Sequence, residues 1–446
     1  MLGSLVGKVF LTFERFVVLS ISALLAVGIF VIAYALIATE KFNRVAIVSV
    51  AAAGMVLVGA TDAEAAFFSH ETGIDWNVIF LLLGMMIIVS VIHKTGLFEY
   101  LAVRAIKAAG GRPKTAFVLI LLLVSFASAL LDNVTTILLA VPMTFLIAKY
   151  LDVNPVPFIL AEVFVSNIGG AATLIGDPPN IIIGSKVGLG FNEFLLHMSP
   201  LSLLVLAAVI PMLVFLFRKQ LVNGPEDRAK VDSLVPSSYI SDKPLMIKSL
   251  VVLTLVIVAF VLHSVTHIEP SLVAMMGAGL LVLISKLKPK DFAMDVEWGT
   301  LTFFAGLFIM VGALVHVGAL GLAADYVGQA VGGNAPLAGT VIVLASAVIS
   351  GVVDNIPYVT SMIPVVAEVA KTLPNLGNDG LWWALAAGAD FGGNLTIVGA
   401  SANVVAVGLA HAKGIKISFW EFAKYGIPVT LVSIAISLPY LLIRYF

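Results

Sequence analysis

The stretch IDWNVIFLLLG at residues 74–84 returns as VEWGTLTFFAG at residues 296–306, and the similarity continues from 74–190 into 296–413. Shifting the sequence by 222 residues (296 minus 74) superimposes the polar pair Asp132-Asn133 on its copy. A shift of 223 residues superimposes the small and polar residues that follow this pair. The superimposed pairs are Asp132-Asn133 with Asp354-Asn355, Gly169-Gly170 with Gly392-Gly393, Thr173 with Thr396, and Asn180 with Asn403. A duplicated hydrophobic unit with matching polar interruptions is typical of secondary transporters, which bind substrate between the two copies.

The composition indicates a helical membrane protein. Hydrophobic residues make up 60% of the chain, charged residues 11%, and the mean hydropathy is +1.10. Several apolar runs are long enough to cross a hydrocarbon core of about 30 Å. They are continuous, whereas a membrane barrel would alternate apolar and polar residues. The clearest runs are 17–39, 45–61, 199–217, 245–262 and 424–443.

Charge and cysteine content exclude several other classes. The chain has no cysteine, so disulfides, thiolate metal sites and cysteine nucleophiles are ruled out. Its net charge of −1 without a long basic run gives no sign of nucleic-acid binding. No nucleophile elbow, zinc helix motif or phosphate loop is found. We therefore expect neither an enzyme nor a cofactor.

Lysine and arginine in the short loops predict the orientation, because they favour the cytoplasmic side. Lys41 and Arg44 follow the first apolar run, whereas the next loop, 61–75, contains neither residue type. The basic segment 94–114 belongs inside, and its counterpart 316–336, without Lys or Arg, suits the outside. Each half then has five spans, an odd number, which makes the two copies antiparallel in the membrane.

The expected domains are an N-terminal repeat over 1–218, a cytoplasmic linker over 219–244 and a C-terminal repeat over 245–446. This arrangement places both termini outside, which Lys8 and Arg15 fit poorly.

Each repeat is expected to contain a re-entrant helical hairpin and a broken helix. The arms 115–131 and 135–148 are short for full crossings and are joined without a loop by Asp132-Asn133-Val134, although two true crossings would leave the same charge pattern. Glycine and proline interrupt the later segment NIGGAATLIGDPPN. The predicted fold is an all-α polytopic membrane protein of two inverted repeats of five transmembrane helices, with hairpins at 113–150 and 337–372 and broken helices at 156–188 and 381–411.

The hairpin tips and helix breaks should meet near the middle of the membrane, because non-helical backbone at that depth must line an enclosed or watery cavity. Half-helix ends there would present carbonyl groups to cations and positive N-termini to anions or polar solutes. The expected substrate-binding residues are Asp132, Asn133, Gly169, Gly170, Thr173, Asn180, Asp354, Asn355, Gly392, Gly393, Asn394, Thr396 and Asn403.

The residues at the two tips have two interpretations each. Asp132 and Asp354 would bind a cation or a proton, or else cap the returning helix. Asn133 and Asn355 would bind a solute through the donors and acceptors of their amides, or else brace the tip against the neighbouring break.

Asp390 is the leading candidate for proton coupling, because its counterpart in the first copy is Asn167. A single titratable group in a pseudo-symmetric site could load a proton on one side and release it on the other. Further candidates for this role are Glu162, Asp132 and Asp354. The alternative for Asp390 is a Na⁺ ligand or a helix cap, and a sodium ion elsewhere could be held by Asp132, Asn133 and Asn167.

Glu162 and Asp177 are interpreted from the residues around them in the sequence. Glu162 lies in an apolar run and is matched by Leu385, so it carries protons or makes a helix-packing hydrogen bond. Asp177 precedes Pro178-Pro179, the pattern of an N-cap with proline in the first helical turn, which favours a structural role.

LDNVTTILLAVP (131–142) and AEVFVSNIGGAATLIGDPPNIIIGS (161–185) resemble the signature stretches of the ion transporter superfamily, in its branch of arsenite-efflux (ArsB), NhaD-type sodium/proton antiporter and pink-eyed-dilution (P protein) members. The resemblance implies a scaffold part, a mobile transport part and, in arsenite members, an optional cytoplasmic ATPase partner. More distant divalent-anion/sodium symporters carry Ser-Asn-Thr at their tips. Here aspartate replaces the serine, which argues against a dicarboxylate substrate.

The predicted function is arsenite or antimonite efflux in exchange for protons, hence arsenical resistance, by a multi-pass protein of the bacterial inner (cytoplasmic) membrane. Arsenous acid is a small neutral triol that amides, threonines and backbone could bind without cysteine. An NhaD-type sodium/proton antiporter is the alternative, and a divalent-anion transporter or a channel is less favoured.

Overall fold

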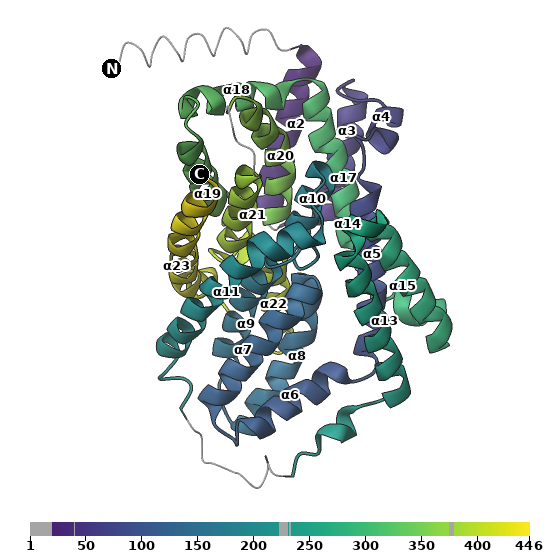
Figure 1. Ribbon diagram of the computed structural model, residues 1–446, viewed down its shortest axis with the longest axis vertical. Coiled ribbons are helices and arrows are strands. Elements are labelled where there is room, and N and C mark those ends of the chain that lie inside the picture. The colour runs from purple at the N-terminus through teal and green to yellow at the C-terminus, as the bar shows by residue number, and fades with distance from the viewer. Residues whose placement is uncertain (1–19, 40, 223–230, 232, 374–378) are drawn as a thin grey trace. The chain divides into compact units, whose positions relative to one another are not determined.

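Helices are the regular secondary structure of the part that the computed structural model describes, which comprises residues 20–39, 41–222, 231, 233–373 and 379–446 (Figure 1). The predicted all-α class is therefore confirmed. Seven of the described helices are long and apolar enough to cross a membrane: Trp76–His93, Pro113–Leu130, Asn133–Leu151, Phe191–Leu216, Lys243–Val261, Trp298–His316 and Phe419–Tyr445.

The two copies follow the same order of helices. The first copy consists of α2 (Ile21–Ala38), α3 (Arg44–Leu57), α4 (Ala63–Phe68), α5 (Trp76–His93), α6 (Leu97–Ala108), α7 (Pro113–Leu130), α8 (Asn133–Leu151), α9 (Val156–Gly170), α10 (Pro178–Val187) and α11 (Phe191–Leu216). The second consists of α13 (Lys243–Val261), α14 (His263–Thr266), α15 (Pro270–Ser285), α16 (Pro289–Ala293), α17 (Trp298–His316), α18 (Ala319–Val331), α19 (Ala335–Ser350), α20 (Asn355–Lys371), α21 (Gly380–Gly392), α22 (Ser401–Ala412) and α23 (Phe419–Tyr445). The 3₁₀ turns are η1 (Pro236–Tyr239) before α13 and η2 (Ile397–Gly399) before α22.

The duplication extends to individual backbone angles. Gly96 and Gly318 are the N-caps of α6 and α18, with φ of 76° and 75°. Gly111 and Gly333 both have φ of 77°. Left-handed backbone favours glycine at these positions, so the two copies turn in the same way at the same places.

The hairpin arms of the first copy are longer than the sequence suggested. α7 and α8 have 18 and 19 residues, so the expectation of short arms is wrong for this copy. Pro113 starts α7 at a position where its missing N–H costs no hydrogen bond, and Asp132 caps α8 directly after the turn. The arms of the second copy, α19 and α20, have 16 and 17 residues.

Both predicted helix breaks are present. In the first copy α9 ends at Gly170 and α10 starts at Pro178, so 171–177 is not α-helical. In the second copy α21 ends at Gly392 and α22 starts at Ser401. Proline cannot continue a preceding helix, and paired glycines weaken one, which accounts for the positions of the breaks.

The chain forms two compact units that each draw on both copies. Unit 1 consists of Met1–Asp75, Trp298–Gly333 and Thr360–Pro374, and in it α17 packs on α2, α3 and α4. Unit 2 consists of Trp76–Glu297, Asn334–Val359 and Asn375–Phe446, and it holds both hairpin tips and both breaks. The expected outside N-terminus, with Lys8 and Arg15, and residues 223–230 and 232 of the expected linker lie outside the described residues.

Close helix packing in unit 2 brings the breaks against the hairpins. α7 packs on α9 and α19 packs on α21, while α8 contacts both α9 and α22 (Figure 1). A Cβ on Gly169 would lie 2.2 Å from the backbone oxygen of Ser125, and one on Gly392 would lie 2.6 Å from Cα of Ala347. Glycine is therefore what allows each broken helix to approach its hairpin.

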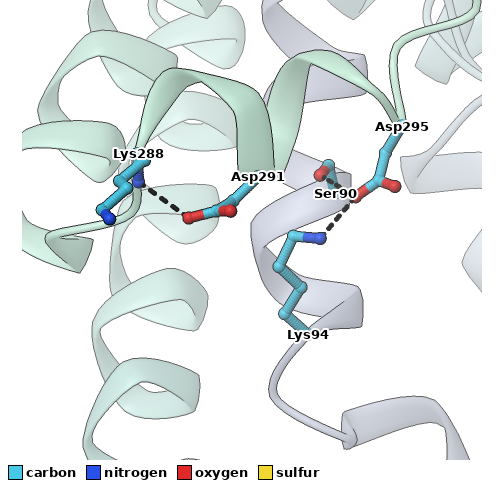
Figure 2. Close-up of polar contacts among 5 residues, drawn as sticks. All are labelled: Ser90, Lys94, Lys288, Asp291 and Asp295. Carbon is cyan, nitrogen blue, oxygen red and sulfur yellow. Dashed lines mark hydrogen bonds and ion pairs between the residues drawn. The ribbon is translucent and has the colours of Figure 1, made fainter.

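A small polar cluster in unit 2 fixes the segment between α16 and α17 to the end of α5 (Figure 2). Asp295 Oδ2 accepts a hydrogen bond from Ser90 Oγ at 2.7 Å and pairs with Lys94 Nζ at 2.7 Å. The backbone N–H of Lys288 donates to Asp291 Oδ2 at 2.9 Å, which stabilises the start of α16.

Candidate functional site

The tip of the first hairpin contacts the first helix break through one asparagine. Asn133 is the first residue of α8 and is buried. Its Nδ2 donates to Asn167 Oδ1 at 3.1 Å and to Asp177 Oδ2 at 2.8 Å. The amide thus ties together the end of α9, the break and the hairpin tip.

The same network continues into the second copy. Asn167 Nδ2 donates to Asn394 Oδ1 at 2.9 Å and to Asn403 Oδ1 at 3.0 Å. Asn355, at the second tip, donates from Nδ2 to Asp177 Oδ1 at 3.3 Å. All these residues belong to unit 2, and one chain of hydrogen bonds joins both tips to both breaks.

Asp177 occupies the centre of this network; it is the N-cap residue of α10, as the Asp-Pro-Pro pattern predicted, but its side chain does not cap the helix. Its side chain makes no capping hydrogen bond to α10; it accepts from Asn133 and Asn355, one from each copy. The Asp-Pro-Pro pattern alone could not reveal this, because it describes only the local helix start. A usable signal was the position of Asp177 in the repeat, where the second copy has Ala400.

Asp132 and Asp354 lie at the tips, where Asp132 has a partner in its own helix and Asp354 has one local partner and one in α22. Asp132 caps α8, accepting from the N–H and the hydroxyl of Thr135. Asp354 accepts from the N–H of Ile356 at 3.1 Å and from Ser401 Oγ at 2.6 Å. Both acids thus lie at the tips, as predicted. The carboxylate that contacts both tips is that of Asp177.

Asn180 and Asn403 brace the two breaks in the same way. Asn180 Nδ2 donates to the carbonyl oxygens of Gly170 and Thr173. Asn403 Nδ2 donates to those of Gly393 and Thr396 at 2.7 and 2.8 Å. These bonds satisfy carbonyl groups that the ends of α9 and α21 leave without helical partners.

The paired threonines hold the hairpins to the breaks. Thr173 donates to the carbonyl oxygen of Ala129, and Thr396 donates to that of Gly351 at 2.6 Å. Gly170, with its Cβ position 2.5 Å from Gly176 O, belongs to the same close packing. The structure thus gives these residues bracing contacts; substrate binding by them stays a prediction.

Asp390 differs from every other acid at the site. It is fully buried, and neither carboxylate oxygen has a hydrogen-bond partner. Its polar neighbour is Asn180, whose Oδ1 is also unpartnered. The repeat-related pair, Asn167 of the first copy and Asn403 of the second, is hydrogen-bonded, because an amide can donate where an ionised carboxylate cannot. A proton on Asp390 would supply the missing donor.

The buried charge of unit 2 is one-sided. Among the described residues five carboxylic acids are buried and no lysine, arginine or histidine is; the acids are Asp132, Glu162, Asp177, Asp354 and Asp390. An ionised carboxylate is costly to bury without compensation. Hydrogen bonds supply part of it for the other four acids, whereas Asp390 accepts none and is the acid that most needs a proton or a cation. No group of three or more acidic or histidine side chains in the described part is arranged to hold a metal ion. Of the proposed sodium ligands, Asn133 and Asn167 contact each other, whereas Asp132 faces Thr135.

Glu162 lies on α9 outside the central network. It is fully buried; Oε1 accepts from Thr144 of α8, and Oε2 has no partner. Both predicted interpretations, proton carrier and helix-packing contact, are compatible with this pairing.

Sequence comparison assigns the chain to a family of transporters. The profile of the CitMHS citrate transporter family matches residues 34–388, which include both hairpin tips and the first break. The chain belongs to this family. It is 51% identical over 426 residues to an uncharacterized transporter of Mycobacterium tuberculosis, covering 95% of this chain and 99% of the relative. A 46 kDa membrane protein of Mycobacterium leprae is 49% identical over 424 residues, with 95% and 99% covered.

More distant matches include one mammalian protein and two solved structures. The mouse P protein is 32% identical over 97% of this chain, which spans 62% of the P protein. The structure of the Alcanivorax borkumensis YdaH transporter superposes with a TM-score of 0.58 at 12% identity, covering 87% of each chain. Neisseria gonorrhoeae MtrF, described as one of a class of antimetabolite efflux pumps, gives 0.58 at 14% identity, covering 88% of this chain and 83% of its own. The family is that of a membrane transporter, and the two structures support the fold alone.

Proposed function

We propose that the protein is a secondary transporter that exports arsenite, and antimonite, in exchange for protons by alternating access. The observation that carries the proposal is the central site itself, where acceptor oxygens of Asp390 and Asn133 lack partners and no basic side chain is buried among the described residues. A ligand for such a site must bring hydrogen-bond donors or positive charge. Arsenous acid is uncharged and brings three hydroxyl groups.

Exchange follows from competition at one carboxyl group. Protonated Asp390 can donate to Asn180 Oδ1 and so reproduce the bond that Asn167 makes to Asn403 in the other copy. Ionised Asp390 instead accepts hydrogen bonds from the hydroxyl groups of the solute. Proton and solute therefore occupy the site in turn, which is the requirement for antiport.

Citrate itself is a poor ligand for this centre despite the family's name. A tricarboxylate would face Asp177 and Asp390 with no buried basic side chain in the described residues to neutralise it. Like charges at contact distance repel strongly when water is excluded.

Sodium/proton exchange is the second candidate, favoured by the same unpartnered oxygens. Asp390, Asn133 Oδ1 and Asn180 Oδ1 are hard oxygen ligands of the kind that Na⁺ prefers. A sodium ion would compete with the proton at Asp390, so the exchange mechanism would stay the same and only the solute would differ.

The proposed membrane location and partner are those predicted from the sequence. We place it in the bacterial inner membrane, in contact with lipid, with a soluble ATPase as an optional cytoplasmic partner. Its close relatives in the comparison are mycobacterial membrane proteins.

Purified protein in sealed vesicles tests the proposal directly. An imposed proton gradient is followed with a pH-sensitive dye while arsenite, antimonite, Na⁺, Li⁺ or citrate is added on one side. We expect arsenite and antimonite to dissipate the gradient in protein-containing vesicles and not in empty ones. A response to Na⁺ and Li⁺ alone would select the second candidate, and a response to citrate alone would overturn both.

A further inference from the structure

We propose that a polar path along the α8–α9 interface, ending at Glu162, carries protons between the central site and the end of these helices that the charge pattern places in the cytoplasm. The inference rests on the proposed proton coupling and adds its route. Its residues all lie in unit 2.

One face of α8 connects the hairpin tip to Glu162. Asn133, Thr136, Ala140 and Thr144 recur at intervals of three and four residues, which places them along one side of the helix. Asn133 contacts Asn167 at one end of this face, and Thr144 contacts Glu162 further along. Eleven residues separate Asn133 from Thr144 (144 minus 133), or about 16 Å at the rise of an α-helix.

Three buried polar atoms on this interface have no partner. They are Asn133 Oδ1, Thr136 Oγ1 and Glu162 Oε2. Their side chains are 2%, 2% and 0% exposed. Buried polar groups without protein partners are where proteins hold ordered water, and water between hydroxyl and carboxyl groups conducts protons.

The second copy lacks this path. At the positions of Thr136 and Thr144 it has Tyr358 and Val366, and in place of Glu162 it has Leu385. The Tyr358 hydroxyl is already paired with Ser346 Oγ at 2.9 Å. A polar interface needed only for packing would be expected in both copies of a duplicated fold, whereas proton transfer to one side of the membrane needs it in one.

The surroundings of Glu162 leave it free to exchange its proton with this path. The helices packed against α9 are α7, α8, α11, α21, α22 and α23. Two of their titratable side chains, Asp132 at the start of α8 and Asp390 in α21, belong to the central site. Others lie at helix ends, among them Lys114, Lys149, His411 and Glu421. Thr144 is the one side chain of the described residues that bonds to the Glu162 carboxyl.

Two transport assays distinguish a proton relay from side chains that have only a structural role. Exchange of labelled for unlabelled solute needs binding and alternating access, whereas accumulation against a gradient also needs net proton movement. With Glu162→Gln and Thr144→Val we expect accumulation to fall at least about tenfold and solute exchange to fall less than about twofold. Thr144→Ser keeps the hydroxyl and should restore accumulation. Thr254→Val is the matched control, because that hydroxyl bonds within its own helix to Leu250 O.

An equal loss of exchange and accumulation in Glu162→Gln and Thr144→Val would overturn the relay. An infrared measurement tests the path independently of which solute the protein transports. The carboxyl band lost on Glu162→Gln should appear in wild-type difference spectra between acidic and alkaline pH, and its midpoint should shift in Asp390→Asn. A band that is present but indifferent to Asp390→Asn would contradict the path, whereas failure of arsenite to move protons would contradict the proposed function only.

Discussion

One difference between the two copies adds an unpartnered acid to the central site. Asn167 donates to Asn394 and Asn403, whereas Asp390, at the matching position, is left with two unpartnered oxygens. A burial of this kind is unfavourable unless the acid is protonated or a ligand compensates it. The unpartnered oxygens of Asp390 therefore lower the stability of the central site, and the proposed exchange would account for their presence.

Asp390→Asn should make the protein at least as stable and remove its proton coupling. The new amide can donate to Asn180 Oδ1, as Asn167 does to Asn403, and satisfying a buried acceptor is worth about 1–3 kcal/mol. We expect an unchanged or higher Tm in detergent and no proton-driven accumulation in vesicles. Asn167→Asp is the matched control and should lower the Tm, because it removes two donated bonds. A lower Tm for Asp390→Asn would contradict this account.

Gly169→Ala should destabilise the contact between the first break and its hairpin. The added Cβ would lie 2.2 Å from Ser125 O, and overpacking of this kind costs about 1–3 kcal/mol. Gly408→Ala, in an exposed helical position with open space around it, should be neutral or stabilising. Thermal unfolding of both variants in detergent checks the difference. Equal Tm values would show that the hairpin can move away without cost.

At the level of elements, the sequence predicted the arrangement better than the individual contacts. The repeat register located both tips and both breaks, because polar and glycine-rich interruptions of apolar runs are visible without a structure. It could not place Asp177, whose partners Asn133 and Asn355 lie 44 and 178 residues away. It assigned Thr173 and Thr396 to a ligand, which stays a prediction, but it could not show that their hydroxyls donate to hairpin carbonyl groups. Such side-chain directions depend on tertiary packing, which periodicity does not encode.

The cluster that attaches the segment before α17 to α5 should contribute a small, pH-dependent stability. Partial burial alone raises the pKa of the Asp295 carboxyl, but hydrogen bonds from Lys94 and Ser90 outweigh it and hold the pKa below the ordinary 3.8. The contribution is then present above about that pH and is lost as the pH falls further. The ion-pair side chains are 31% and 38% exposed, so the pair is worth only about 0.5 kcal/mol.

Lys94→Met should therefore lower the Tm slightly at neutral pH, and the difference from wild type should close as the pH falls below 3.8. Lys371→Met is the matched control, since its pair with Glu368 is more exposed, at 71% and 42%, and should contribute nothing measurable. Thermal unfolding at neutral pH and at a pH below 3.8 provides the comparison. A gap that widens in acid would have the wrong sign for a carboxylate with a lowered pKa.

At the level of the whole molecule, the boundary between the two sequence copies does not coincide with the boundary between the two compact units. Each copy supplies helices to both units, and the hairpin tips and breaks of both copies belong to unit 2. The mobile transport part that the family resemblance implied would require a central site built in one compact body; that this body moves stays a prediction. The site then depends on the second copy being inverted, since only opposed copies bring two tips to one carboxylate from opposite sides of the membrane.

Single-cysteine labelling can test this inversion, because the natural chain contains no cysteine to give a background. Ala108→Cys in α6 and Gln329→Cys in α18 are exposed positions at nearly equivalent places in the two copies. Inversion predicts that an impermeant maleimide on intact cells labels Gln329→Cys, and labels Ala108→Cys only after permeabilisation. Val265→Cys, in the turn predicted to be outside, and Ser237→Cys, in the linker, give the reference for each side. If Ala108→Cys and Gln329→Cys react from the same side, the copies are parallel, and the two tips cannot enter the membrane from opposite faces.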